Sequence, residues 1–433
     1  MIPGLAAGSR RPAHARSRLM ASYPVMRDAQ RAAEEAARDS YGRLVAYLSA
    51  RSRDVAAAED ALGEAFRAAL ETWPASGVPE RPEAWLLTAA RSRLIDRTRR
   101  AAVRAEAAPT LRLLADEAQE AAAAAMLPDD RLRLLFICAH PAIDARVRTP
   151  LMLQTVLGLD AARIASAFCV APAAMGQRLV RAKAKIRVAG IAFELPDARE
   201  LPERLGAVLD AIYAAYGAGW EDAAGSDPRR SGLAEEAIWL ARLVRELMPE
   251  AAEARGLLAL MLHCEARRRA RRAPDGAYVP LSEQDVTRWS QAMIAEAERE
   301  LAAAASLRAP GRFQLEAAIQ SAHAHRAVTG RTDWEAILLL YDELVRQAPT
   351  LGALVGRAAA LGSARGPAAG LAALDEIAPR SVVAYQPYWA VRAHVLAGLG
   401  MKDEARAAYA RAIGLSEDEP AREFLARRAG ALG

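Results

Sequence analysis

Apolar residues recur at helical spacing along most of the chain, and this pattern predicts an all-α fold. Near the N-terminus, a helix over residues 28–49 places Leu44 and Leu48 on one face. Asp54 is a suitable N-cap for a second helix, which is apolar on one side. The other side of this second helix carries Glu59, Asp60, Glu64 and Glu71.

A third amphipathic helix follows a loop that is rich in turn-forming residues. The loop over residues 73–83 contains three prolines and a glycine, which break helices and favour turns. The helix then opens with apolar and aromatic residues around Trp85 and ends in a series of arginines. Its basic half, residues 91–104, is one of three dense basic clusters in the chain.

Residues 149–185 form the most informative stretch. An apolar helix over residues 151–157 leads through Gly158 to a short helix over 160–168, a break at 169–170 and a long basic helix. Asp160 is a suitable N-cap for the short helix, and Pro172 is tolerated in the first turn of the basic one. The apolar seam between these two helices is predicted to consist of Ile164, Ala165, Phe168, Met175 and Leu179.

Two helices joined by a short break, the second carrying exposed basic residues, are typical of a DNA-binding helix-turn-helix. An ordinary helical hairpin with a solvated basic face is the alternative interpretation of the same pattern. Ala171, which precedes Pro172, is a poor N-cap for the basic helix. Pro150 lies near the start of the apolar helix over residues 151–157 and is expected to shorten that helix by a turn.

The C-terminal half, from about residue 201, is predicted to consist of stacked helix pairs. Tyr341, Leu374 and Tyr409 occupy similar positions that are 33 and 35 residues apart. Gly400, Ala405, Tyr409 and Ala412 match the small and aromatic positions of one tetratricopeptide repeat. A period of about 34 residues favours an α-solenoid, whose surfaces usually bind peptides or other domains.

Charge and composition narrow the range of functions. The net charge is +5, and the basic residues cluster at 91–104, 178–187 and 267–272, as phosphate binding requires. For the third cluster, a solvated helix end is favoured over nucleic-acid binding. The cysteines Cys138, Cys169 and Cys264 lie far apart in apolar contexts, which indicates reduced core residues of a cytoplasmic protein.

No pattern of catalytic or cofactor-binding residues is found. His323 and His325 would point to different faces of a helix and make a poor metal pair. Phosphate-binding glycine loops, nucleophile elbows and zinc spacings are absent from the sequence, so neither enzymatic activity nor a cofactor is predicted. No apolar run is long enough to cross a membrane. Residues 1–27 are expected to form a disordered arm, with Met20 and Met26 as alternative starts.

Taken together, these motifs resemble a bacterial sigma factor of the extracytoplasmic-function type. The acidic helix with Glu59-Asp60 and Glu64-x-Phe66, the Pro/Gly loop and the Trp85-Leu86…Arg99-Arg100 helix resemble sigma region 2. Residues 149–185 take the place of sigma region 4, and residues 129–143 and 177–183 resemble the subgroup with a tetratricopeptide-type extension.

The resemblance implies a domain organisation and a set of partners. Region 2 would cover residues 28–104, a linker 105–128, region 4 residues 129–192, and a helical-repeat regulatory domain 197–433. The implied partners are promoter DNA, core RNA polymerase through its β′ clamp and β flap, and a signalling protein or peptide on the repeats. No membrane partner is implied.

The roles implied for individual residues fall into three groups. The polymerase contacts would be Glu59, Asp60 and Glu64. The promoter −10 contacts would be Arg81, Arg91, Ser92, Arg93, Arg97 and Arg100. The −35 contacts would be Gln177, Arg178 and Arg181, with Lys183 and Lys185 mostly on phosphates.

The sequence departs from the family pattern at four positions. Gly63 stands where glutamine is usual, and Ser92 where asparagine is common; Pro150 and Ala171 are the other two. These departures motivate an alternative, in which the chain is a repeat scaffold with a degenerate sigma-like half. A nucleic-acid enzyme is disfavoured by the lack of paired carboxylates in the basic segments, and a repressor would have no use for region 2.

Overall fold

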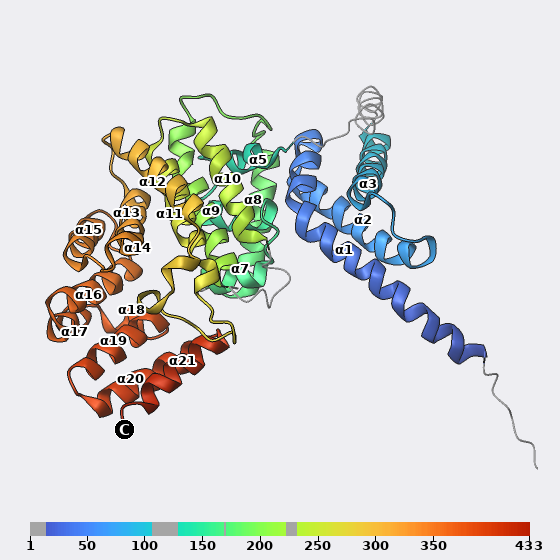
Figure 1. Ribbon diagram of the computed structural model, residues 1–433. Helices are drawn as coiled ribbons and strands as arrows, with labels where there is room; N and C mark the ends of the chain where they lie inside the picture. Colours follow the sequence, from blue (N-terminus) through green and yellow to red (C-terminus); the bar gives the residue numbers. More distant parts are fainter. Residues whose placement is uncertain (1–13, 106–128, 169, 222–231) are drawn as a thin grey trace, which may run out of the picture. The chain divides into compact units, whose positions relative to one another are not determined.

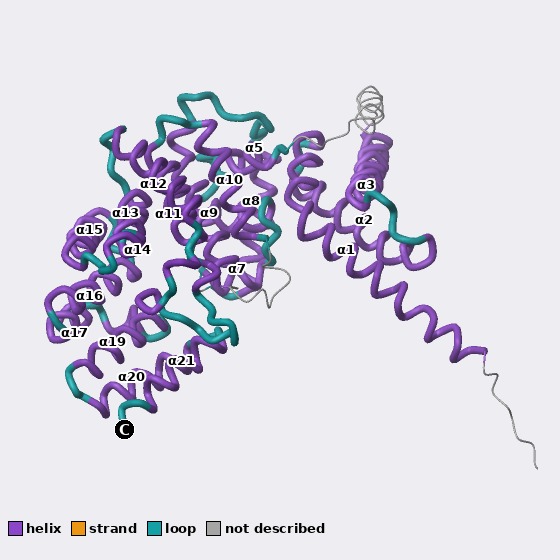
Figure 2. Tube along the Cα trace, in the orientation of Figure 1, coloured by secondary structure: helices purple, strands orange, loops and turns teal. Residues whose placement is uncertain are grey.

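The computed structural model describes residues 14–105, 129–168, 170–221 and 232–433, and its regular elements there are helices (Figures 1 and 2). The only extended pairing within these ranges is an isolated bridge between Arg272 and Tyr278. The prediction of an all-α fold is confirmed. Among the described helices, none combines the length and the apolar character that crossing a bilayer requires.

The chain divides into two compact units, Met1–Ala211 and Ile212–Gly433. The division falls within helix α9 (Leu201–Glu221), whose residues up to Ala211 belong to the first unit. In that part of α9, the Arg204 guanidinium donates to the Phe136 carbonyl at 3.3 Å. The other helices of the first unit are α1 (His14–Ser52), α2 (Val55–Ser76), α3 (Pro82–Ala105), α5 (Arg131–Cys138), α6 (Ala145–Thr155), α7 (Ala161–Ala167) and α8 (Pro172–Val188).

Helices α1, α2 and α3 pack on one another around an apolar core. Leu48, Leu62 and Leu86, one from each helix, are fully buried. Trp73 of α2 is also buried, and it meets Trp85 of α3 edge to face with 5.5 Å between the ring centroids. The predicted cap of α2 is confirmed, since an Asp54 side-chain oxygen accepts the Ala57 N–H at 3.1 Å.

Two expectations about helix boundaries are wrong. Helix α1 begins at His14, so residues 14–27 of the expected disordered arm are helical, in keeping with their content of the helix formers alanine, arginine and methionine. Helix α6 begins at Ala145 and runs through Pro150 without being shortened. Pro150 and the three residues after it are buried, so tertiary packing outweighs the local cost of the proline.

The second unit is a succession of helices in which each packs mainly on its neighbours in sequence (Figure 1). This is the organisation of a solenoid. Its helices are α10 (Leu233–Leu247), α11 (Ala252–Ala266), η1 (Arg268–Ala270), η2 (Leu281–Glu283), η3 (Val286–Arg288), α12 (Gln291–Ser306), α13 (Arg312–Ala324), α14 (Arg326–Thr329), α15 (Trp334–Gln347), α16 (Leu351–Arg365), α17 (Pro367–Asp375), α18 (Pro379–Val382), α19 (Gln386–Gly398), α20 (Lys402–Leu415) and α21 (Glu419–Gly430).

The periodic positions of the sequence recur on equivalent helices of this unit. Tyr341, Leu374 and Tyr409 lie on α15, α17 and α20, which are the second helices of the pairs α13/α15, α16/α17 and α19/α20. Leu374 and Tyr409 are buried, and Tyr341 packs against a neighbouring apolar cluster. Gly400 has a φ of +75° in the turn between α19 and α20, a conformation that favours glycine.

The arginine run at residues 267–272 is not a solvated helix end, and that expectation is wrong. Arg267 is only 6% exposed and donates to the Gln320 side chain at 2.5 Å, and Arg272 donates to Asp418 at 2.7 Å. Arg268 donates to the Glu265 carboxylate at 2.6 Å. Within the run only Arg269 is exposed. The other arginines join segments that are far apart in sequence within the second unit.

Acidification from pH 6.5 to 4 is expected to destabilise the second unit through two histidines, the buried His263 and the partly buried His323. Burial and, to a smaller extent, the charge of Arg267 together lower the pKa of each from 6.5 to about 4. Unfolded histidines protonate near pH 6.5, so unfolding takes up protons in this window and stability falls as the pH falls. Each histidine is expected to contribute on the order of 3 kcal/mol.

Urea denaturation at pH 7.5 and pH 4.5 tests this expectation. His263→Leu should lose a large part of the difference in unfolding free energy between the two pH values. His394→Leu, at an exposed position, should retain the wild-type difference. An equal difference in both variants would contradict the argument from burial.

Candidate nucleic-acid interface

The acidic side of α2 and the basic side of α3 face each other and form ion pairs. Arg97 lies 2.9 Å from Asp60, and Arg93 lies 3.6 Å from Glu64. These four side chains are 45% to 64% exposed. Exposed pairs of this kind contribute about 0–1 kcal/mol each, so either partner can exchange for an external charge at little cost.

Arg91 has a more structural position than its neighbours on α3. Its guanidinium lies 5.0 Å from the centroid of the Tyr47 ring and donates to the Tyr47 hydroxyl. Tyr47 is buried on α1, and Arg51 covers its ring at 3.4 Å. Arg91 therefore helps to hold α3 against α1 and is only partly exposed.

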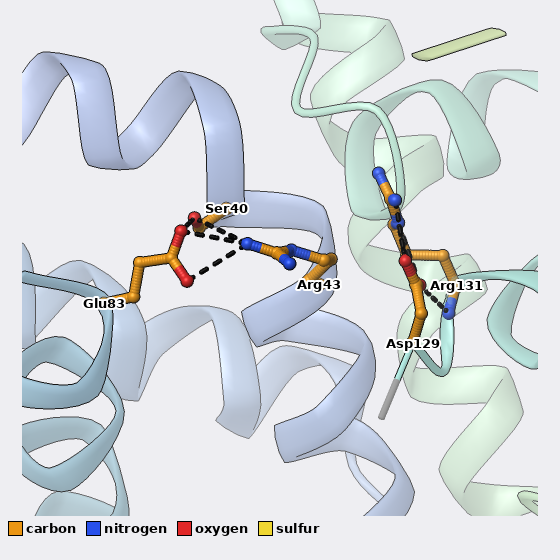
Figure 3. A network of polar contacts seen from close by, with 5 residues as sticks. All are labelled: Ser40, Arg43, Glu83, Asp129 and Arg131. Atoms are coloured by element: carbon orange, nitrogen blue, oxygen red, sulfur yellow. Dashed lines mark hydrogen bonds and ion pairs between the residues drawn. The ribbon is translucent and has the colours of Figure 1, made fainter. Parts of the chain in front are cut away.

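The start of α3 is fixed by a polar network with α1 (Figure 3). Glu83 accepts two hydrogen bonds from Arg43, at 2.9 and 3.0 Å, and a short one from the Ser40 hydroxyl. The network holds the end of the loop that carries Arg81, whose carbonyl accepts the Trp85 N–H at 3.2 Å. Arg81 and Ser92 are exposed, whereas the side chain of Arg100 lies outside the described part of the structure.

Helices α7 and α8 have the local geometry that the sequence predicts. Asp160 accepts the N–H groups of Ala162 and Arg163 at 3.0 and 2.9 Å, which confirms it as the N-cap of α7. Ala171 makes no side-chain cap, and Pro172 lies in the first turn of α8. The predicted break at 169–170 lies partly outside the described residues, because position 169 is not described.

The predicted seam between α7 and α8 is confirmed except for one residue. Ile164, Ala165, Met175 and Leu179 are buried. Phe168 is 38% exposed because it lies at the C-cap, where the chain leaves the helix.

The predicted −35 residues do not all lie on one face of α8. Gln177, Arg181 and Lys185 are exposed, and Arg178 is partly exposed. Lys183, in contrast, is buried and forms an ion pair with Glu59 of α2. The expectations that Lys183 is an exposed phosphate contact and that Glu59 lies on the free surface are therefore wrong for this conformation.

The burial of this pair follows from helical spacing. Lys183 lies four and eight residues after the buried Leu179 and Met175, and thus on the apolar side of α8. Glu59 lies four residues after the buried Val55 and three before the buried Leu62. Burial raises the pKa of Glu59, and the adjacent Lys183 ammonium opposes that rise.

Sequence reasoning missed two further contacts next to this pair. Arg187 of α8 lies 3.1 Å from Asp54, which therefore serves both α8 and the N-terminus of α2. Gly42 of α1 packs against the backbone of Val156, so closely that a side chain there would overlap the Val156 carbonyl. A glycine inside a predicted helix was the available signal for such a close approach.

Comparison with known proteins identifies the family of the first three helices. The family model for sigma-70 region 2 matches residues 37–104, which include the C-terminal part of α1, all of α2 and nearly all of α3. Residues 37–104 belong to the sigma-70 family as its region 2. The match places both charged faces, on α2 and on α3, within region 2.

Two further comparisons concern the rest of the chain. A second family model, described as a family of unknown function (DUF6596), matches residues 204–305. An uncharacterized protein, R00370, from Rhizobium meliloti (strain 1021) is 40% identical over 381 residues, which cover 87% of this chain and 89% of that protein. The two proteins therefore belong to one family that extends well beyond region 2. No solved structure matches the chain.

Proposed function

We propose that this protein is a sigma factor of the extracytoplasmic-function type, which directs core RNA polymerase to promoters with −10 and −35 elements. The observation that carries the proposal is the coincidence of the region 2 match with two adjacent, exposed charged faces. An acidic face suits a basic surface of the polymerase, and a basic face suits promoter DNA.

Within region 2, each face has a separate role. Asp60 and Glu64 contact the β′ clamp, because both are exposed on α2. Arg93 and Arg97 bind the −10 element, and the exposed Ser92 and Arg81 contribute to base recognition. Melted DNA is bound by such cationic surfaces together with contacts to unstacked bases.

Residues 129–192 serve as region 4, with α7 and α8 as the helix-turn-helix. Gln177, Arg178 and Arg181 read or position the −35 element, Lys185 contacts phosphate, and the β flap is the polymerase partner. Asp160 and the buried seam support this role, because they fix α8 relative to α7.

Residues 197–433 serve as a tetratricopeptide-like regulatory domain that binds a signalling protein or peptide. The stacking of successive helix pairs supports this assignment. A sigma factor acts where the polymerase does, which places the protein in the cytoplasm. It has no enzymatic activity or cofactor of its own. The scaffold alternative is disfavoured because α2 and α3 retain both charged faces.

Run-off transcription on fragmented genomic DNA, followed by sequencing of the transcripts, tests the proposal. Core polymerase with the full-length protein is expected to start at a set of sites that share two conserved elements. Core polymerase alone gives only unspecific starts. If addition of the protein leaves the start sites unchanged, and it does not co-purify with core polymerase at low salt, the protein is a scaffold and the proposal is wrong.

A further inference from the structure

Helix α21, the last of the second unit, is held by few apolar contacts. Of its 12 residues only Leu425 is buried, in a cluster that includes Tyr409 and Ala412 of α20. Phe424 packs against the same cluster and is partly buried. A helix of this length is only marginally stable by itself in water. The position of α21 therefore depends on the side chains that surround it.

A second set of contacts with α21 comes from a loop that lies much earlier in the sequence. Residues 271–283 reach α21 within the second unit (Figure 1). Along this loop a cation, an aromatic ring and an anion each meet a complementary group of α21 or of its N-cap. The three pairs are Arg272 with Asp418 at 2.7 Å, Tyr278 with Phe424 at 5.4 Å between ring centroids, and Glu283 with Arg428. We call the three loop residues, together with Tyr409 and Ala412, the α21 seat.

The loop is anchored to other parts of the second unit. At its start, the Arg271 guanidinium donates to the Trp220 carbonyl at 2.7 Å, and an antiparallel bridge joins Arg272 to Tyr278. At its end, Arg326 donates at 2.7 to 3.0 Å to the backbone carbonyls of Leu281, Ser282 and Gln284. Because these anchors do not involve α21, the seat is expected to persist when α21 leaves it.

The polar pairs between the seat and α21 are weak enough to exchange. The Glu283 and Arg428 side chains are 52% and 47% exposed, and exposed ion pairs contribute little to stability. Asp418 is the N-cap of α21, where it accepts the Ala421 N–H at 3.1 Å. Another helix with an acidic N-cap could therefore reach Arg272 in the same way.

We infer that α21 is an exchangeable occupant of this seat, and that a partner of the helical-repeat domain binds by inserting an amphipathic helix of the same pattern. The inference rests on the proposed role of residues 197–433 in partner binding, and it adds the surface and the chemistry of the partner. The partner helix carries an acidic N-cap, adjacent aromatic and aliphatic residues in its middle, and a basic residue in its last turn. An amphipathic helix that lays its apolar face on an apolar surface is a common mode of recognition.

The short connection to α20 gives α21 an advantage over an external helix. Helix α20 ends at Leu415 and Asp418 caps α21, so residues 416–417 connect them. A helix tethered this closely has an effective concentration on the order of millimolar. The apparent affinity of an external helix is reduced by the small fraction of molecules whose seat is empty. Weakening the chain's own α21 should therefore increase the affinity of an external helix.

Fluorescence anisotropy with a labelled peptide of residues 416–433 tests the exchange on the full-length protein. The wild type is expected to bind this peptide weakly, because its own α21 competes. Phe424→Ala with Leu425→Ala in the full-length chain should bind the peptide at least about tenfold more tightly than the wild type does. The matched control is Glu423→Ala with Arg427→Ala, which removes two exposed side chains of the same helix and should match the wild type. A peptide with the alanines at 424 and 425 should bind to none of these chains.

A charge exchange shows whether the peptide occupies the α21 seat. Glu283→Arg in the full-length chain repels the wild-type peptide at Arg428, so this variant should prefer a peptide with Arg428→Glu. The double alanine chain, which retains Glu283, should prefer the wild-type peptide. Glu283 is exposed, so its replacement is expected to leave the fold intact, and circular dichroism checks that each chain is folded. If the double alanine chain is unfolded, the ranking of the two peptides by the wild type and by Glu283→Arg decides alone.

Three results would overturn the inference. One is a folded double alanine chain that binds the peptide no more tightly than the wild type. Another is a ranking of the two peptides that Glu283→Arg does not change, or a failure of both peptides to bind any folded chain. The third is a wild-type dimer, measured by light scattering, that the double alanine chain loses, because a second copy of this chain would then supply the helix. Polymerase and promoter DNA are absent from these measurements, so each of these results leaves the proposed sigma activity intact, whereas failure of the run-off experiment leaves peptide exchange intact.

Discussion

Replacement of both Arg178 and Arg181 by alanine is expected to weaken promoter binding by the polymerase complex roughly 100-fold. Arg181 is exposed on α8, and Arg178 is partly exposed. A well-placed contact to a base edge contributes about 1–3 kcal/mol, and each phosphate contact adds to the salt dependence of binding. The slope of log K against log salt should become less negative by roughly one for each arginine that contacts a phosphate.

Binding should be measured with the assembled polymerase complex at several salt concentrations. Arg146→Ala is the matched control, because it removes an exposed arginine from α6 and leaves α8 intact. It should retain both the wild-type affinity and the wild-type slope. A double alanine variant with the same slope as Arg146→Ala would show that α8 is not the recognition helix.

Most of the helical framework could be predicted from local sequence. The caps Asp54 and Asp160 form hydrogen bonds with the N–H groups of their own first turns, so a few consecutive residues contain all the necessary information. The seam residues Ile164 and Leu179 follow from helical periodicity in the same way. The family of region 2 could be recognised because its charged and apolar positions lie on three consecutive helices.

The errors concern residues whose environment comes from distant parts of the chain. The sequence predicts that Lys183 contacts DNA, because basic residues are usually exposed, but its partner Glu59 lies 124 residues earlier. It also predicts that Arg272 is solvated, but its partner Asp418 lies 146 residues later. Neither partner follows from local propensity, since any of the many carboxylates in the chain would satisfy the same charge.

Periodicity nevertheless contained a usable signal for Lys183. A basic residue in register with Met175 and Leu179 lies on the apolar side of an amphipathic helix. Its charged end must then either extend to the surface or form an ion pair with a carboxylate. The pattern therefore raised the question of a partner, although it could not identify Glu59. Similarly, Pro150 could be judged only once the burial of α6 was known.

Removal of the two exposed carboxylates of α2, by Asp60→Asn and Glu64→Gln, is expected to weaken association with core polymerase roughly 100-fold or more. Loss of a charged hydrogen-bonding partner at an interface costs about 2–5 kcal/mol. The stability of the protein should hardly change, because the ion pairs of these residues with Arg97 and Arg93 are exposed and contribute about 0–1 kcal/mol each. Co-purification with core polymerase at low salt and a thermal melt measure the two effects.

The arginines of the same ion pairs allow a reciprocal experiment. Arg93→Gln with Arg97→Gln breaks the same two pairs, but leaves the carboxylates free to bind the polymerase. This variant should retain core association and lose promoter-dependent transcription, whereas the carboxylate variant should lose both. Glu71→Gln controls for charge, since Glu71 lies on the same helix and pairs only locally with Arg67 at 2.8 Å. If the arginine and carboxylate variants instead share one defect, together with a lowered melting temperature, the pairs stabilise region 2 and the two faces do not bind separate partners.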